Sequence, residues 1–216
     1  MSDAVAARRA QKDQLLESAL MHAAFDGWSR RTLINAASDI GVDAATARRL
    51  FPQGGDSLVV WLDDWTDRNM LEAAAKEDLA RLSIRRRIAW LVRTRLEILS
   101  PYRESLRRAA LAQILPQNVA QAGRSLWTTV DRIWQAAGIT AGREEGISYF
   151  TRRGLLAGVL LSTFLYWLED QSDGFADSWA FLDRRIDDAL RLGKAGSQVT
   201  NAISGLPGMG FVRKPA

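Results

Sequence analysis

Helical spacing of apolar residues runs along most of this 216-residue chain and constrains its fold more than any other feature. Apolar side chains recur every three or four positions, and no sustained period-two alternation is bounded by turn residues. An α-helix places such residues on one face, whereas a half-buried β-strand needs the missing alternation. The sequence therefore predicts an all-α protein.

The longest apolar run supports a buried helix rather than a membrane span. It extends from Gly154 to Leu168, 15 residues between Arg153 and Glu169. A helix that crosses a bilayer needs about 20 predominantly apolar residues. We therefore expect a central helix of a bundle, wrapped by other helices.

Composition excludes several kinds of chemistry. The chain has no cysteine and one histidine, so it has no zinc-thiolate cluster, thiol nucleophile, disulfide scaffold or multi-histidine metal site. Adjacent carboxylates such as Asp63 and Asp64 diverge by about 100° on a helix and do not converge as an acid–base pair. His22 stands alone on the first predicted helix. We expect no catalytic residue, no metal and no cofactor.

The net charge of +4 is unevenly distributed. Between Arg81 and Arg108 nine arginines face only Glu97 and Glu104, whereas residues 1–56 are neutral overall. A basic chain suggests an anionic partner, but the neutral first block supplies little of the charge that drives DNA affinity.

Helix boundaries and composition divide the chain into three parts. We expect a three-helix domain at residues 1–55, a larger helical domain at 56–192 and a flexible tail at 193–216. Ser29, Asp43 and Asp56 are the expected N-caps, and Gly41 permits a tight turn between two helices. Residues 56–82 and 175–192 are each expected to form one helix. The tail contains five glycines, two prolines and no acidic residue.

The first part resembles the helix-turn-helix domain of TetR-type repressors. The resemblance rests on Phe25-Asp-Gly27-Trp28, Ile40-Gly41-Val42-Asp43 and Leu50-Phe51-Pro52. In that family the second helix of the motif enters the DNA major groove with polar and basic residues. Here it reads Asp43-Ala-Ala-Thr-Ala-Arg-Arg49, with Arg48 in place of a tyrosine and Gly54-Gly55 in place of a lysine. We expect a domain with degenerate DNA contacts. The alternative is a working repressor with an apolar inducer pocket.

Several phrases of the second half resemble the lipid-binding accessory protein of coenzyme Q biosynthesis, the Coq-nine family. They are Leu115-Pro-Gln-Asn118, Leu126-Trp127, Asp131-Arg-Ile-Trp134, Tyr149-Phe-Thr-Arg-Arg153-Gly-Leu-Leu-Ala157, Leu165-Tyr-Trp-Leu-Glu-Asp170 and Ser178-Trp-Ala-Phe-Leu-Asp-Arg-Arg-Ile-Asp187. The resemblance implies a TetR-like fold and a non-catalytic protein of ubiquinone biosynthesis. Such a protein binds isoprenoid quinone intermediates in an apolar cavity and supports the membrane-bound demethoxyubiquinone hydroxylase.

Apolar residues of two predicted helices are the candidate lipid-binding residues. They comprise Trp127, Val130, Ile133, Trp134, Leu155, Val159 and Phe164. The first four recur at three- and four-residue spacing on one helical face, and together with Leu155, Val159 and Phe164 they line either a cavity or an ordinary core.

The start of the central helix is the candidate partner-binding surface. Tyr149, Phe150 and Arg153 combine two aromatic rings with a cation, a composition favoured at interfaces, and the family resemblance implies contact with the hydroxylase. By the same resemblance, the segment 146–192 forms a homodimer interface. Small residues at Gly154, Gly158 and Ser162 permit close helix approach there, or simply packing within one chain.

The tail is a candidate membrane anchor. Val199, Ile203 and Leu206 share one helical face, Phe211 follows, and Lys194, Arg213 and Lys214 add three positive charges. The alternative is a disordered tail with incidental apolar residues. The first twenty residues lack an apolar signal core, so we expect a cytoplasmic bacterial protein without signal or transit peptide, peripheral on the inner face of the membrane.

Overall fold

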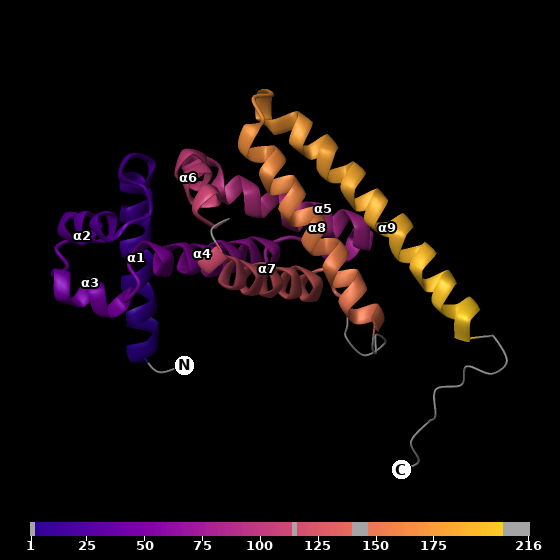
Figure 1. The fold of residues 1–216 in the computed structure, drawn as a ribbon, viewed down its shortest axis with the longest axis horizontal. Coiled ribbons are helices and arrows are strands. Elements are labelled where there is room, and N and C mark those ends of the chain that lie inside the picture. Colours follow the sequence, from indigo (N-terminus) through magenta and orange to yellow (C-terminus); the bar gives the residue numbers. More distant parts are fainter. Residues whose placement is uncertain (1–2, 114–115, 140–146, 205–216) are drawn as a thin grey trace, which may run out of the picture. The chain divides into compact units, whose positions relative to one another are not determined.

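The computed structural model describes residues 3–113, 116–139 and 147–204 (Figure 1). All regular structure in these segments is helical, which confirms the predicted all-α class. The α-helices are α1 (Asp3–Asp26), α2 (Arg30–Asp39), α3 (Ala44–Leu50), α4 (Gly55–Ala74), α5 (Ile84–Leu99), α6 (Arg103–Gln113), α7 (Pro116–Ala136), α8 (Ile147–Glu169) and α9 (Ala176–Ser204). Short 3₁₀ turns lie at Leu79–Arg81, Ser100–Tyr102 and Asp173–Phe175. No described helix is both long and apolar enough to cross a bilayer.

Contacts divide the chain into an N-terminal unit, residues 1–139, and a C-terminal unit, residues 140–216. Helices α1 to α7 belong to the first unit, and α8 and α9 belong to the second. The boundary after Ile139 falls inside the segment 56–192, which the sequence treats as one domain. The division at residues 55 and 192 remains a prediction.

The first three helices form the expected helix-turn-helix arrangement (Figure 1). Ser29 caps α2 by accepting a hydrogen bond from the Thr32 amide, and Asp43 caps α3 in the same way from Thr46. Gly41 between these helices has a φ of 68°, a conformation that residues with a Cβ rarely adopt. The predicted caps and turn are therefore confirmed.

The start of α4 explains the two glycines that replace the lysine of DNA-binding relatives. Gly54 precedes the helix with a φ of 60°. A Cβ on Gly55 would lie 2.1 Å from the carbonyl oxygen of Trp28, so only glycine fits there. The backbone of α4 thus approaches the loop before α2 too closely for a side chain. The predicted helix over residues 56–82 ends earlier, at Ala74, and a 3₁₀ turn follows at Leu79–Arg81.

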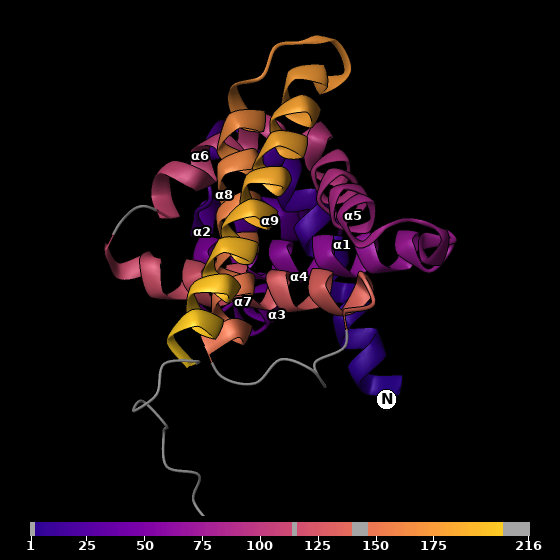
Figure 2. The same ribbon diagram turned by 90° about the vertical axis from the view of Figure 1, so that its right-hand side faces the viewer.

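Helices α4, α5 and α7 form the body of the N-terminal unit. α4 packs against both α5 and α7 and lies alongside α7 (Figures 1 and 2). Each helix contributes fully buried apolar side chains, namely Leu58 and Met70 from α4, Leu91 and Val92 from α5, and Val130 and Ile133 from α7. The apolar spacing in the sequence therefore marks a real core.

The C-terminal unit is an antiparallel hairpin of α8 and α9 (Figures 1 and 2). Leu156, Leu160 and Trp167 of α8 are buried, as are Leu182 and Ile186 of α9. Helix α9 continues to Ser204, beyond the predicted end at Leu192. Glycine inside a helix costs only about 1 kcal/mol, and α9 contains long stretches of good helix formers, so its glycines do not end it.

Candidate functional site

One face of α8 is apolar yet exposed. Phe150, Gly154, Gly158, Leu161 and Leu165 follow one another at spacings of three and four, so they share this face. Phe150, Leu161 and Leu165 are 64%, 49% and 49% exposed. A Cβ added at Gly154 or Gly158 meets no atom within 4 Å. A continuous exposed apolar face of this kind is typical of an interaction surface.

A polar corner joins α8 to α9. One carboxylate oxygen of Asp170 accepts hydrogen bonds from the amide and hydroxyl of Ser172, at 2.8 and 2.6 Å. The other oxygen accepts from the amide and hydroxyl of Ser178, at 2.9 and 2.5 Å. Burial alone would raise the pKa of Asp170, but these hydrogen bonds outweigh it and lower the pKa to about 2. The ionised carboxylate therefore fixes the corner.

Aromatic side chains pack around the same corner. Phe175 lies edge-to-face against Trp167 and Trp179, with ring centroids 5.9 and 6.2 Å apart. The Trp179 indole N–H donates to the carbonyl of Gly174 at 2.8 Å. Phe175 itself has a φ of 58°, a strained conformation for a bulky residue. Packing and hydrogen bonds together hold the chain in this conformation.

A groove of about 660 Å³ opens beside the corner. It is lined by Ser162, Leu165, Tyr166, Glu169, Asp170, Gln171, Asp177 and Phe181. The Tyr166 and Phe181 rings stack with centroids 4.5 Å apart and planes 10° apart. The groove therefore combines a flat aromatic surface with acidic side chains.

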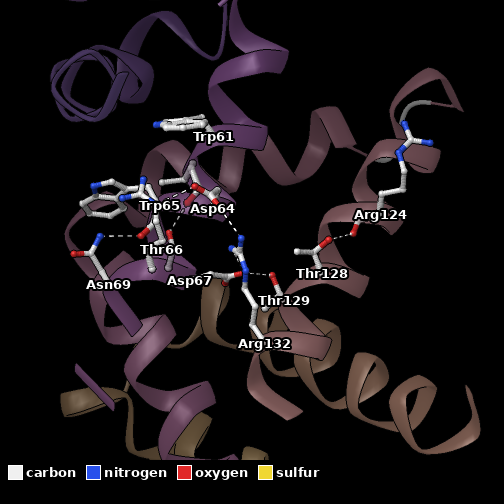
Figure 3. A network of polar contacts seen from close by, with 12 residues as sticks. Trp61, Asp64, Trp65, Thr66, Asp67, Asn69, Arg124, Thr128, Thr129 and Arg132 are labelled. Atoms are coloured by element: carbon white, nitrogen blue, oxygen red, sulfur yellow. Dashed lines mark hydrogen bonds and ion pairs between the residues drawn. The ribbon is translucent and has the colours of Figure 1, made fainter. Parts of the chain in front are cut away.

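A second polar feature lies inside the N-terminal unit. Asp67 of α4, which is 1% exposed, accepts a hydrogen bond from Arg95 of α5 at 2.9 Å. It also accepts one from Thr129 of α7 at 2.8 Å (Figure 3). Arg132 of α7 donates to Asp67 at 3.2 Å and to Asp64 at 2.7 Å. This network, which we call the Asp67 network, ties α4, α5 and α7 together.

The Asp67 network extends to α1 through Arg68. Arg68 bonds to Asp64 at 2.9 Å and to both carboxylate oxygens of Asp13, at 2.7 and 3.1 Å. Burial opposes ionisation of Asp64, but hydrogen bonds from Arg132 and Arg68 outweigh it and lower the pKa of Asp64. Asp63 turns instead to Arg95, so the neighbouring carboxylates diverge as expected. Within the described segments no group of three or more acidic or histidine side chains could hold a metal ion.

The predicted lipid-binding residues fall into two sets in different units. On α7, Val130 and Ile133 are fully buried, Trp134 is 6% exposed and Trp127 is half-buried. On α8, Val159 is buried, and Leu155 and Phe164 are half-buried. Lipid contact by either set remains a prediction.

The predicted partner-binding residues differ in exposure. Phe150 is 64% exposed, whereas Arg153 is only 3% exposed. The side chain of Tyr149 lies outside the described part of the chain. Phe150 is therefore exposed and Arg153 buried, and partner binding by this set remains a prediction.

The predicted membrane-binding residues lie largely outside the described residues. Val199 and Ile203 fall in α9, but their side chains are not described, and Leu206 and Phe211 follow the last described residue, Ser204. Their role remains a prediction.

Side chains of α3 are engaged locally. Asp43 caps the helix, and Arg49 donates to the Thr46 hydroxyl at 2.6 Å. Three of its seven residues are alanines. The expectation of degenerate DNA contacts remains a prediction, supported by these alanines, which offer no hydrogen-bonding group to base edges.

Sequence comparison identifies the family of the chain. The COQ9 family model matches residues 119–193, which include α8 and most of α9. The rat protein "Ubiquinone biosynthesis protein COQ9, mitochondrial" is 30% identical over 211 residues, covering 93% of this chain and 67% of the rat protein. The chain belongs to the COQ9 family. The human protein of the same name is 28% identical over 212 residues, which is 93% of this chain and 65% of the human protein. This COQ9 family member thus spans about two thirds of the length of these relatives.

Structural comparison confirms the TetR-like fold of this COQ9 family member. A crystal structure of the TetR transcriptional regulator from Nitrosomonas europaea superimposes with a TM-score of 0.69. The alignment covers 84% of this chain and 98% of the regulator at 22% sequence identity, so the likeness concerns the fold alone.

The relatives correct one expectation. The rat, human, Xenopus, Drosophila and Dictyostelium relatives are all named as mitochondrial proteins. The expectation of a cytoplasmic bacterial protein, peripheral on the inner face of the membrane, is therefore wrong. It rested on the composition of the first twenty residues, which the comparisons overrule.

Sequence reasoning missed the Asp67 network and the groove, although both leave a signal. Arg95 falls at a position of α5 surrounded by the buried Leu91, Val92 and Leu96, where an arginine needs an acidic partner. The groove is signalled by a long stretch without basic residues, from Gly154 to Asp183.

Proposed function

We propose that this protein acts in ubiquinone biosynthesis as a non-catalytic accessory protein. In this proposal it binds isoprenoid quinone intermediates and presents them to the membrane-associated demethoxyubiquinone hydroxylase. The observation that carries the proposal is the 30% identity to the rat ubiquinone biosynthesis protein over 93% of the chain. The exposed apolar face of α8 supports it, because it lies in the segment that the family model matches.

The physical role of such a protein is to position its lipid rather than to change it chemically. Exposing a prenyl tail to water costs roughly 25 cal/mol per Å². A tail that leaves the bilayer must therefore pass directly onto an apolar surface of the protein. Leu155, Val159 and Phe164 of α8 are proposed to contact the tail. Holding the quinone head near the hydroxylase raises the reaction rate through proximity.

Mass spectrometry of lipid extracted from the purified full-length protein tests lipid binding. We expect an isoprenoid quinone intermediate at close to one molecule per chain or per dimer. Leu155→Gln should reduce the retained lipid about tenfold, because about 1.5 kcal/mol of apolar contact is lost. Met21→Gln, on the exposed surface of α1, is the matched control and should retain lipid. Absence of any prenyl lipid, or equal loss in both variants, would refute the proposal.

Co-purification with the hydroxylase tests the partner surface. Phe150→Ala removes a ring that is 64% exposed, so the fold should be unaffected while the complex weakens. The control is again a change at Met21, to alanine. If the Phe150 variant retains the hydroxylase as well as the control does, this surface is not the contact.

We also propose a homodimer through the exposed apolar face of α8. Gly158→Leu tests it, since a Cβ added at this position meets no atom of its own chain within 4 Å. The variant should fold normally by circular dichroism and elute as a monomer in size-exclusion chromatography with light scattering. A variant that remains dimeric would contradict this interface.

Membrane attachment through the tail is proposed from the composition of residues 193–216 alone. Co-sedimentation with anionic liposomes should decrease when the chain is ended at Leu192. If the full-length and shortened chains bind liposomes equally, the tail is not the membrane anchor.

A further inference from the structure

The groove beside the α8–α9 corner is lined by apolar residues, which we call its floor, and by acidic residues, which we call its rim. Leu165, Tyr166 and Phe181 form the floor, where the two aromatic rings stack 4.5 Å apart. Glu169 and Asp177 lie at the rim, and both are exposed. Leu165 and Tyr166 are 49% and 38% exposed, so apolar surface in the groove faces solvent. This composition fits a ligand that is both apolar and positively charged.

Charge around the groove favours a cation. Every charged residue that lines it is acidic, and the sequence from Gly154 to Asp183 contains no lysine or arginine. Arg184 and Arg185 lie 6.0 and 5.2 Å from the centroid of the Phe181 ring, and Arg185 pairs with Asp188 at 2.7 Å. The groove therefore offers electrostatic complementarity to a basic segment.

The chain itself carries a segment of matching composition. Residues 205–216 contain Met209, Phe211 and Val212, followed directly by Arg213 and Lys214, and include no acidic residue. We propose that this segment of one copy docks in the groove of a second copy. Its apolar side chains lie on the aromatic floor and its two cations face the acidic rim.

The length of the chain selects the second copy over the same copy. Phe181 and Ser204 lie on one helix, α9, and a rise of 1.5 Å per residue separates them by about 35 Å. From Ser204 to Phe211 the fully extended chain spans at most about 25 Å. The Cα of Phe211 therefore stops about 10 Å short of the Cα of Phe181 in its own chain, even when the segment is fully extended. A second copy has no such restriction.

Docking in a second copy shields apolar groups that both partners otherwise expose to water. Leu165 belongs both to the groove and to the exposed apolar face of α8, so the docked segment would continue that face. The inference concerns the protein alone and does not depend on lipid binding.

Disulfide trapping between full-length chains tests the inference, because the natural chain contains no cysteine. One variant carries Gln171→Cys at the groove, and the other carries Gly210→Cys beside Phe211. After mixing and mild oxidation without lipid vesicles, we expect a covalent heterodimer in non-reducing electrophoresis. A disulfide needs the two Cα atoms within about 7 Å, so its formation reports docking. The matched control is Gln135→Cys, exposed on α7, which should cross-link about tenfold more slowly because no binding raises its effective concentration.

Charge reversal distinguishes docking from random collision. Arg213→Glu with Lys214→Glu in the tail variant should slow cross-linking to the control rate, whereas Arg213→Lys should preserve it. Glu169→Lys in the groove variant should also slow it. Equal rates at Gln171 and Gln135, no effect of charge reversal, or mainly intramolecular cross-linking in a chain with both cysteines would each overturn the inference.

Discussion

Replacing Asp67 with asparagine tests whether the Asp67 network holds the N-terminal unit together. The carboxylate is 1% exposed and accepts hydrogen bonds from Arg95, Arg132 and Thr129. Asparagine keeps one acceptor oxygen but turns an NH₂ group toward donors, and it leaves Arg95 with one acidic partner, Asp63. Breaking a buried charge pair in this way costs about 3–5 kcal/mol.

Urea denaturation followed by tryptophan fluorescence and circular dichroism measures that cost. We expect a lower transition midpoint with an unchanged slope, and a melting temperature about 6–20 °C lower for a chain of this size. The control is Glu97→Gln, which removes the exposed Arg93–Glu97 pair of α5, with side chains 51% and 47% exposed. An exposed i,i+4 pair contributes about 0.3–0.5 kcal/mol. Equal destabilisation by Asp67→Asn and Glu97→Gln would refute the assigned role of the network.

Three further predictions concern stability. Gly55→Ala should destabilise the fold by more than about 2 kcal/mol, since its Cβ would lie 2.1 Å from the Trp28 carbonyl oxygen. The control is Gly123→Ala on α7, where a Cβ meets no atom within 4 Å and should stabilise the fold by up to about 1 kcal/mol. Chemical denaturation of both variants measures the two changes. The pKa of Asp170 is lower in the folded protein, about 2, than its ordinary value of 3.8, so the ionised carboxylate stabilises the fold at pH values above about 4. This contribution should be lost as the pH falls from about 4 towards 2. Asp170→Asn should abolish that part of the pH dependence in thermal melts, and an unchanged profile would contradict the assignment. Trp28→Phe removes the hydrogen bond from the indole N–H to the Ser105 carbonyl at 2.8 Å and should cost about 1 kcal/mol in the same denaturation assay, with no change meaning that the bond contributes nothing.

Local signals in the sequence predict local structure well in this protein. Ser29 and Asp43 cap α2 and α3 as predicted, because a cap depends only on residues within one turn. The predicted end of α9 at Leu192 is wrong, because the helix continues through Gly193 and Gly196 to Ser204. The start of α4 also escapes a local signal: Asp56 suggests a cap, yet the helix begins after Gly54 at the close approach to Trp28.

The sequence by itself determined the helical class, the helix-turn-helix arrangement and the family resemblance, because each is written in residues that are close together along the chain. Only the tertiary structure decided which charges are paired and which apolar side chains are exposed. Asp67 meets Arg95 and Thr129 from 28 and 62 residues away, and Phe150 and Arg153 differ in exposure although both stand at the start of one amphipathic pattern. Burial and pairing depend on which helices pack together, and a one-dimensional pattern specifies the faces of helices but not their neighbours.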